Sequence, residues 1–272
     1  MYAFCSRYEE KVEGGTFSSL VKEYTMRKSL VLAIVLFFTL VLGRANAAEM
    51  TVSGAASLTN AFTALKDAFE KKTPDCTVHT NFAASNPLLK QIQEGAPVDV
   101  FASADQETMD KAEKGNLIDP KTRKDFVRND LVLIVPKGKT KPAKLSDIST
   151  YARIAIGTPA SVPAGRYAQQ SLTAAKLWEG LQSKFVYGNN VRQVLDYVAR
   201  DEVDAGIVYK TDALKQKDKV EIALTLENHK AILYPIAVVN TGKNPQMGKK
   251  FVDFALSPEG QTILQKYGFM AP

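Results

Sequence analysis

Met50-Thr-Val-Ser-Gly54 is a short β-branched stretch that leads through Ala55-Ala-Ser57 straight into an amphipathic segment. The apolar side chains of that segment recur at spacings of four, three and four residues, at Leu58, Phe62, Leu65 and Phe69. Such spacing places apolar residues on one face of a helix. The stretch therefore predicts a strand, a tight turn and a helix that packs on a sheet.

The same unit recurs along the chain. Strands are expected at residues 50–54, 76–82, 97–102, 131–135, 153–157, 185–187, 205–209 and 234–239. Helices are expected between several of them, one starting near Asn86-Pro87 and ending by Gly95, and another starting at Pro163. Short β-branched runs that alternate with amphipathic helices are typical of an α/β protein, and they predict largely parallel sheets.

Length and composition agree with a globular protein. The chain has 272 residues, of which 45% are hydrophobic and 24% charged, enough apolar material for one or two cores. These values exclude disordered, collagen-like and coiled-coil chains.

The N-terminal region has the pattern of an export signal. Met26-Arg-Lys begins a basic stretch, residues 30–42 are almost entirely apolar, and Ala45-Asn-Ala47 has the small residues that a signal peptidase recognises. We therefore expect residues 26–47 to be a signal peptide cleaved after Ala47, with Met26 as the true start and residues 1–25 as a doubtful extension. The apolar run is too short to span a membrane comfortably, because a span needs about 20 residues. No cysteine stands at the cleavage site, so the periplasm of a Gram-negative bacterium is expected rather than a lipid anchor.

The charge distribution argues against a nucleic-acid partner, and the cysteine count argues against an internal disulfide in the mature chain. The net charge is +6, and removing the extension (−1) and the signal peptide (+3) leaves +6 + 1 − 3 = +4 on the mature chain. This excess is spread along the chain without a dense basic block, so nucleic-acid binding is not expected. Cys76 is the single cysteine of the mature chain, and its alternating neighbours predict a buried core thiol.

The inventory of catalytic groups is small. His79 and His229 have no metal-ligand pattern around them, and the sequence contains no nucleophile elbow, phosphate loop or dinucleotide fingerprint. Asp99 and Asp105 are a possible acid/base pair for a periplasmic hydrolase, the alternative from another functional class. Asp99 lies in an expected strand and Asp105 in the first turn of an expected helix, where the helix dipole also favours a carboxylate, so capping is the expected function there.

Small and hydroxyl-bearing residues occupy several turns from strand to helix. Each lies at or within about one turn of an expected helix N-terminus or at a strand end, where free backbone N–H groups favour an anion. These residues are Ser57, Ser85, Ala164, Val191 and Tyr209. Because open α/β sheets bind ligands at the carboxyl ends of their strands, we expect the five to form one anion site.

Five motifs, in order along the chain, resemble the molybdate-binding periplasmic proteins of ABC-type uptake systems. They are Ala55-Ala-Ser-Leu-Thr-Asn60, the segment from Phe82-Ala-Ala-Ser85 to Ala-Ser-Ala-Asp105, Val162-Pro-Ala-Gly165, Asn190-Val-Arg192 and Gly206-Ile-Val-Tyr209. The likeness extends from about Thr51 to the Tyr267-Gly-Phe269 ending. One departure is that Ala84, Asn86 and Pro87 replace a stretch that is richer in serine and threonine in that family.

The resemblance implies a two-lobed solute-binding fold of type II, in which each lobe is a sheet flanked by helices and the ligand lies in the cleft between lobes. Lobe 1 is expected to comprise residues 48–130 and 235–272, and lobe 2 residues 131–234. Carried over by motif, the ligand positions are Ser57, Ser85, Ala164, Val191 and Tyr209. The implied ligand is molybdate or tungstate, the implied partner is an inner-membrane ABC permease with a cytoplasmic ATPase, and a monomer without cofactor or catalytic activity is expected.

The five positions offer donors only. Molybdate and tungstate are fully deprotonated dianions near neutral pH, whereas phosphate keeps a proton that needs an acceptor, and none of the five residues is acidic. Sulfate also lacks a proton, so its exclusion depends on a cleft spaced for longer metal–oxygen bonds. A binding protein for sulfate or another tetrahedral oxyanion is therefore the alternative within the same class.

Overall fold

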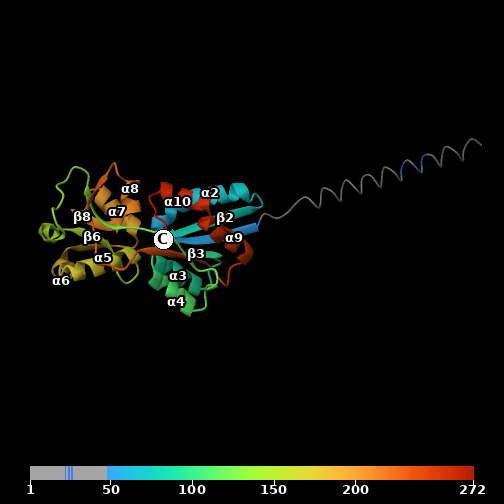
Figure 1. Cartoon of the computed structure of the whole chain (residues 1–272), viewed down its shortest axis with the longest axis horizontal. Coiled ribbons are helices and arrows are strands. Elements are labelled where there is room, and N and C mark those ends of the chain that lie inside the picture. Colours follow the sequence, from blue (N-terminus) through green and yellow to red (C-terminus); the bar gives the residue numbers. More distant parts are fainter. Residues whose placement is uncertain (1–21, 23, 25, 27–47) are drawn as a thin grey trace, which may run out of the picture. The chain divides into compact units, whose positions relative to one another are not determined.

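The computed structural model describes residues 22, 24, 26 and 48–272 (Figure 1). The expected extension and signal peptide therefore lie outside the described residues, apart from Lys22, Tyr24 and Met26. Every strand of the described residues belongs to the unit that comprises residues 47–272.

Five strands form the first sheet of this unit. They are β1 (Ala48–Ala55), β2 (Cys76–Ala83), β3 (Val100–Ala102), β4 (Lys124–Arg128) and β10 (Leu233–Val238). Their order across the sheet is β2-β1-β3-β10-β4. β1 pairs in parallel with β2 and β3, and β10 runs antiparallel to β3 and β4.

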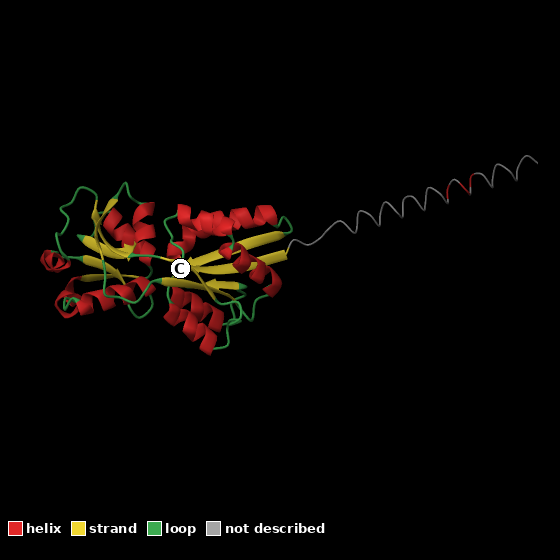
Figure 2. Ribbon diagram, in the orientation of Figure 1, coloured by secondary structure: helices red, strands yellow, loops and turns green. Residues whose placement is uncertain are grey.

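Helices cover both faces of the first sheet (Figures 1 and 2). They are α2 (Thr59–Lys72), α3 (Ser85–Gln93), α4 (Gln106–Lys114), α9 (Pro245–Leu256) and α10 (Pro258–Lys266). The expected apolar stripe of α2 is buried: the rings of Phe62 and Phe69 lie 6.0 and 5.3 Å from that of Phe251 in α9. Helices α3 and α4 enclose a second core, in which Leu88 and Met109 are fully buried.

The second sheet also has five strands. They are β5 (Leu131–Pro136), β6 (Ile154–Gly157), β7 (Phe185–Gly188), β8 (Ala205–Tyr209) and β9 (Val220–Thr225), in the order β7-β6-β8-β5-β9. Its helices are α5 (Pro163–Ala174), α6 (Trp178–Leu181), α7 (Val191–Ala199) and α8 (Lys210–Lys215). Short 3-10 helices lie at η1 (Ala56–Leu58), η2 (Leu145–Thr150) and η3 (Gln182–Lys184).

The expectation of largely parallel sheets is wrong. Two strand pairs in each sheet are antiparallel, and all four involve β10 or β5. The chain leaves the first sheet at β4 and enters the second at β5, and it returns at β10. Because these two strands arrive from the other sheet rather than through a crossover helix, nothing forces them to run parallel to their neighbours.

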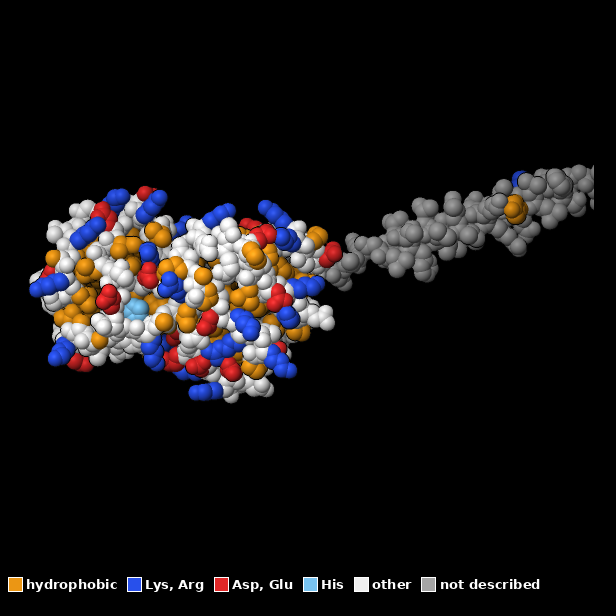
Figure 3. Space-filling model, in the orientation of Figure 1, with side chains coloured by type: hydrophobic (Ala, Val, Ile, Leu, Met, Phe, Trp, Pro, Cys, Tyr) orange, Lys and Arg blue, Asp and Glu red, His pale blue; other side chains and the backbone are white. Residues whose placement is uncertain are grey.

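Other expectations are met by the described residues. Cys76 is a free thiol, 3% exposed, as expected for a core cysteine. On the face shown in Figure 3, Lys and Arg side chains are interspersed with Asp and Glu. None of the helices in the described part of the chain is both long enough and apolar enough to cross a membrane.

Candidate functional site

Ser57 and Ser85 lie at matching positions on neighbouring parallel strands. Ala55 at the end of β1 pairs with Ala83 at the end of β2, and each serine follows two residues later. Ser57 lies in η1, which leads into α2, and Ser85 is the first residue of α3. The register of one strand pair therefore brings both hydroxyls to the same edge of the first sheet.

The other three predicted residues begin helices of the second sheet. Ala164 is the second residue of α5, Val191 is the first of α7, and Tyr209 ends β8 and directly precedes α8. The first N–H groups of a helix have no acceptor within it, so Ala164 and Val191 present backbone donors. All five predicted residues are at most 3% exposed.

Ser57 ends an ordered series of hydrogen bonds. Asn129 Nδ2 donates to Tyr234 Oη at 3.3 Å, and Tyr234 Oη lies 3.0 Å from Ser57 Oγ. Either hydroxyl can donate in this bond. When Tyr234 is the donor, the Ser57 proton is left for a ligand oxygen.

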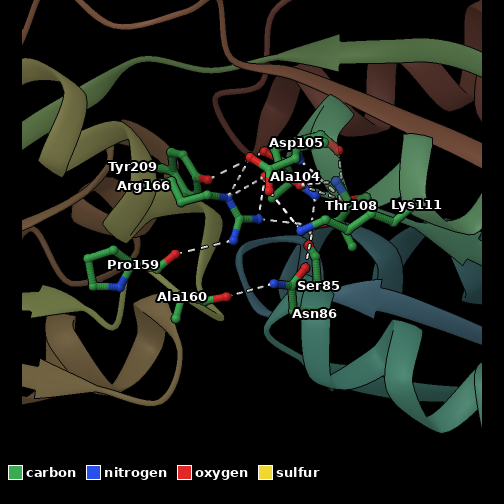
Figure 4. Close-up of polar contacts among 12 residues, drawn as sticks. Ser85, Asn86, Ala104, Asp105, Thr108, Lys111, Pro159, Ala160, Arg166 and Tyr209 are labelled. Carbon is green, nitrogen blue, oxygen red and sulfur yellow. Dashed lines mark hydrogen bonds and ion pairs between the residues drawn. The ribbon is translucent and has the colours of Figure 1, made fainter.

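Ser85 and Tyr209 meet at Ala104, in the segment between β3 and α4 (Figure 4). The Ala104 N–H donates to Ser85 Oγ at 3.0 Å, so Ser85 also keeps its hydroxyl proton for another acceptor. Tyr209 Oη donates to the Ala104 carbonyl at 3.4 Å, a long bond from which an anion can recruit the phenol. The structure thus brings Ser57, Ser85 and Tyr209 together, since the ring of Tyr209 also lies 5.7 Å from that of Tyr234.

Ala164 and Val191 join this group through the arginines that follow them. Arg192, next to Val191, donates to the Ser57 carbonyl at 3.2 Å and to Asn60 Oδ1 at 2.9 Å. Arg166, two residues after Ala164, pairs with Asp105 of the first lobe. Among the described residues, the Ala164 and Val191 backbones form no hydrogen bond with either serine and connect to them through these arginines.

Burial keeps the tyrosines of this region neutral. It raises the pKa of Tyr209 and of Tyr234 well above the ordinary value for a phenol. Both hydroxyls are therefore protonated donors at neutral pH. A negative ligand meets donors here rather than a competing phenolate.

The candidate catalytic carboxylates have separate structural functions. Asp99 accepts the backbone N–H groups of Thr51 at 2.7 Å and Asn244 at 2.6 Å, which joins β1 to the start of α9. Asp105 caps α4 by accepting from Thr108 N at 3.2 Å and also binds Arg166. Capping is thus confirmed for Asp105, whereas Asp99 fixes a loop.

The histidines are structural or exposed, as the sequence predicts. The side chain of His79 is 57% exposed, and the ring of His229 binds the carbonyls of Leu226 and Lys230 at 3.1 and 2.8 Å. Within residues 48–272 and the three described residues before them, no group of three His, Cys, Asp or Glu side chains is arranged to hold a metal ion.

Tyr234, Arg166, Asp105 and the Arg192–Asp212 ion pair are parts of the site that the sequence reasoning did not assign to it. Arg192 Nε lies 2.6 Å from Oδ1 of Asp212, a fully buried carboxylate in the first turn of α8. Arg192 ends the Asn190-Val-Arg192 motif, and Arg166 directly follows the Val162-Pro-Ala-Gly165 motif. Their positions in the sequence could therefore have indicated both arginines. Tyr234 lies in an expected strand with no motif around it, and only the folded chain brings it to Ser57.

Asp212 predicts a pH dependence of stability. Burial raises the pKa of its carboxyl to about 6, although Arg192 opposes the shift. Between about pH 4 and 6 the folded chain keeps a proton that the unfolded chain has lost, so the free energy of unfolding falls as pH rises through this window, by about 3 kcal/mol. Asp212→Asn removes this contribution. Urea unfolding at pH 4, 5, 6 and 7 should therefore show the variant gaining stability over the wild type as pH rises, and a constant difference would contradict the prediction.

The chain matches a known protein family and several of its members. Residues 50–270 match the bacterial extracellular solute-binding protein family. The chain is 40% identical over 225 residues to the putative ABC transporter substrate-binding lipoprotein YvgL of Bacillus subtilis, covering 82% of this chain and 86% of that protein. It is 38% identical over 233 residues to the molybdate-binding protein ModA of Escherichia coli, covering 83% and 90%.

A solved structure agrees with the arrangement of the two sheets. The substrate binding domain of a putative molybdenum ABC transporter from Clostridium difficile matches with a TM-score of 0.65 at 35% identity, covering 83% of this chain and 99% of that one. Together with the two helix-flanked sheets, this similarity confirms the expected two-lobed α/β fold of type II.

Proposed function

The chain belongs to the family of bacterial extracellular solute-binding proteins, and from this premise we propose that it captures molybdate, and tungstate with it, between its two lobes. It then delivers the anion to an inner-membrane ABC permease whose cytoplasmic ATPase supplies the energy. In this proposal the chain performs no reaction, holds no cofactor and acts as a monomer. Relatives whose names specify molybdate or molybdenum cover nearly the same part of the chain.

The observation that carries the proposal is the set of hydrogen bonds around the two serines. The Ala104 N–H donates to Ser85 Oγ, which leaves the Ser85 proton for a ligand. Tyr234 Oη lies 3.0 Å from Ser57 Oγ, and when Tyr234 is the donor the Ser57 proton is also left for a ligand. Ala164 and Val191 add backbone N–H groups, and Tyr209 adds its phenol. A lining composed of donors suits an anion whose oxygens all accept.

Discrimination against phosphate follows from the proposed ligand residues. None of the five is acidic, so none of them accepts the proton that phosphate keeps at neutral pH. The buried carboxylates of Asp105 and Asp212 are each ion-paired with an arginine. Sulfate has no such proton, so its rejection depends on the spacing of donors alone.

Export completes the proposal. We place the mature chain, from Ala48, in the periplasm of a Gram-negative bacterium after removal of residues 26–47. Lobe 1 then comprises residues 48–130 and 235–272, and lobe 2 residues 131–234. Asn129 N donates to the Ile232 carbonyl at 3.1 Å, so the two crossing segments lie side by side near these boundaries and provide a suitable hinge.

Thermal unfolding of residues 48–272 tests the ligand class. Molybdate and tungstate, each at 100 times its dissociation constant, should stabilise the folded chain by about 2.7 kcal/mol, because a ligand that binds only the folded state shifts the equilibrium by mass action. Phosphate and sulfate should leave the melting temperature unchanged. A rise with sulfate would assign the protein to the sulfate class, and no response to any of the four anions would refute an oxyanion function.

A further inference from the structure

A second polar network joins the lobes beside the proposed anion site (Figure 4). Arg166 of α5 donates through Nε to Asp105 Oδ2 at 3.0 Å, and its Nη2 contacts the same oxygen. The two side chains are 12% and 5% exposed, so water screens their attraction little. Asp105 is in the first lobe and Arg166 in the second, and this ion pair therefore exists only while the lobes are together.

The network continues through three hydrogen bonds, which lead from Arg166 in lobe 2 to two side chains of lobe 1 and back to lobe 2. Arg166 Nη2 donates to Thr108 Oγ1 at 3.0 Å, and Thr108 donates to Asn86 Oδ1 at 2.7 Å. Asn86 Nδ2 then donates to the Ala160 carbonyl at 2.9 Å. The side chains of Thr108 and Asn86 in lobe 1 thus lie between Arg166 and the Ala160 carbonyl of lobe 2. In each of these hydrogen bonds one group can donate and the other can accept.

The lobe 1 half of the network is held by hydrogen bonds within lobe 1 itself. Thr108 N and Ser103 Oγ each lie 3.2 Å from Asp105 Oδ1, which leaves Oδ2 for Arg166. A carboxylate held in place loses little conformational freedom when its partner arrives, and a charge-assisted, two-point bond to arginine is among the stronger polar contacts.

The residues of this network are also close in sequence to the proposed anion site. Asn86 follows Ser85, and Arg166 lies two residues after Ala164. Asp105 follows Ala104, which is hydrogen-bonded to Ser85 and Tyr209. We propose that Arg166, Asp105, Thr108 and Asn86 form an interlobe clasp, which holds the N-terminus of α5 against lobe 1 and slows release of the bound anion. This inference rests on the proposed function and extends it: these four are positioning residues, and the anion contacts remain those named above.

Two variants distinguish the clasp from a simple charge effect. R166Q removes a cation as well as the ion pair, so weaker binding alone would also fit direct attraction of the anion by Arg166. D105N keeps Arg166 and, because asparagine also caps helices well, keeps the start of α4. If Arg166 acted only through its charge, D105N would bind the anion as tightly as the wild type or more tightly.

The experiment measures molybdate affinity by calorimetry and release of radiolabelled molybdate into excess unlabelled anion. R166Q and D105N should each speed release by roughly tenfold with little change in association, and the double variant should be no faster than the faster single one. The matched control is R123Q. Arg123 forms ion pairs with the exposed carboxylates of Asp110 and Glu113 within lobe 1 alone, so its loss should leave the release rate unchanged.

Release at the wild-type rate from R166Q and D105N, or D105N binding as tightly as the wild type while R166Q is weakened, would overturn the clasp. Unfolding without ligand checks that each variant folds. If the wild type binds no molybdate, the proposed function fails and X-ray scattering without ligand decides on the clasp separately. A larger radius of gyration for R166Q than for R123Q and wild type would support it, and equal values would refute it.

Discussion

The double variant Ser57→Ala/Ser85→Ala is expected to bind molybdate more weakly than the wild type by at least about tenfold. Each hydroxyl donates to a charged acceptor in the proposed site, and the loss of such a donor costs about 1 to 3 kcal/mol. Both serines contact the same anion, so the double variant should lose at least as much as the larger single variant, without strict additivity. Calorimetry on the two single variants and the double variant measures this directly.

Ser53 supplies the control for these variants. It lies in β1 of the same lobe, is fully buried, and its Oγ has no hydrogen-bond partner in the described residues. Ser53→Ala is the same chemical change in the same strand–turn unit, and it should leave molybdate affinity unchanged. Wild-type affinity in the double Ser57/Ser85 variant would remove both residues from the site, and an equal loss in Ser53→Ala would show a general effect on the sheet.

The serine variants also have a predictable structural cost. Ser85→Ala leaves the buried Ala104 N–H without its acceptor, whereas Ser57→Ala leaves the Tyr234 hydroxyl without its neighbour. Each variant should therefore lose about 1 kcal/mol of stability or more without ligand. Because binding is measured well below the melting temperature, this loss does not imitate a loss of affinity.

The periodic elements of the fold could be predicted from the sequence. The α2 stripe and the runs that form β5 and β8 are determined by apolar periodicity, because burial of one helix face or of a whole strand leaves a direct pattern in the residues. The strands β4 and β9 were missed. Both lie at the edge of a sheet, where polar residues such as Lys124 and Glu221 interrupt the pattern.

The sequence predicts only part of the candidate site. Residues at helix N-termini could be proposed because strand-to-helix turns are visible in the sequence, and family motifs identified which of those turns to choose. The hydrogen-bond partners could not be predicted. Asn129 and Tyr234 are more than 100 residues apart, and Arg166 and Asp105 are 61 apart, so their contacts arise only from tertiary structure.

Gly165→Ala is expected to lower the free energy of unfolding by about 3 kcal/mol and to weaken molybdate binding at the same time. A Cβ at this position would lie 2.0 Å from the Gly157 carbonyl oxygen and 2.6 Å from its carbon. Both are backbone atoms at the end of β6, so no side-chain rotation relieves the clash. The first turn of α5 must move away from the sheet.

That movement reaches the proposed site because Gly165 lies between Ala164, a proposed backbone donor, and Arg166 of the clasp. A displaced first turn misplaces both residues. Affinity for molybdate should therefore fall by more than the loss of the Ala164 donor or of the Arg166 contact alone would cause.

Gly180→Ala is the matched control: it is also a helical glycine, in α6, and a Cβ there would meet nothing within 4 Å. This control should keep wild-type affinity and gain up to about 1 kcal/mol of stability, since alanine favours helix. Urea unfolding and calorimetry on both variants make the comparison, and a Gly165→Ala protein as stable and as tightly binding as Gly180→Ala would show that α5 does not need its close approach to β6.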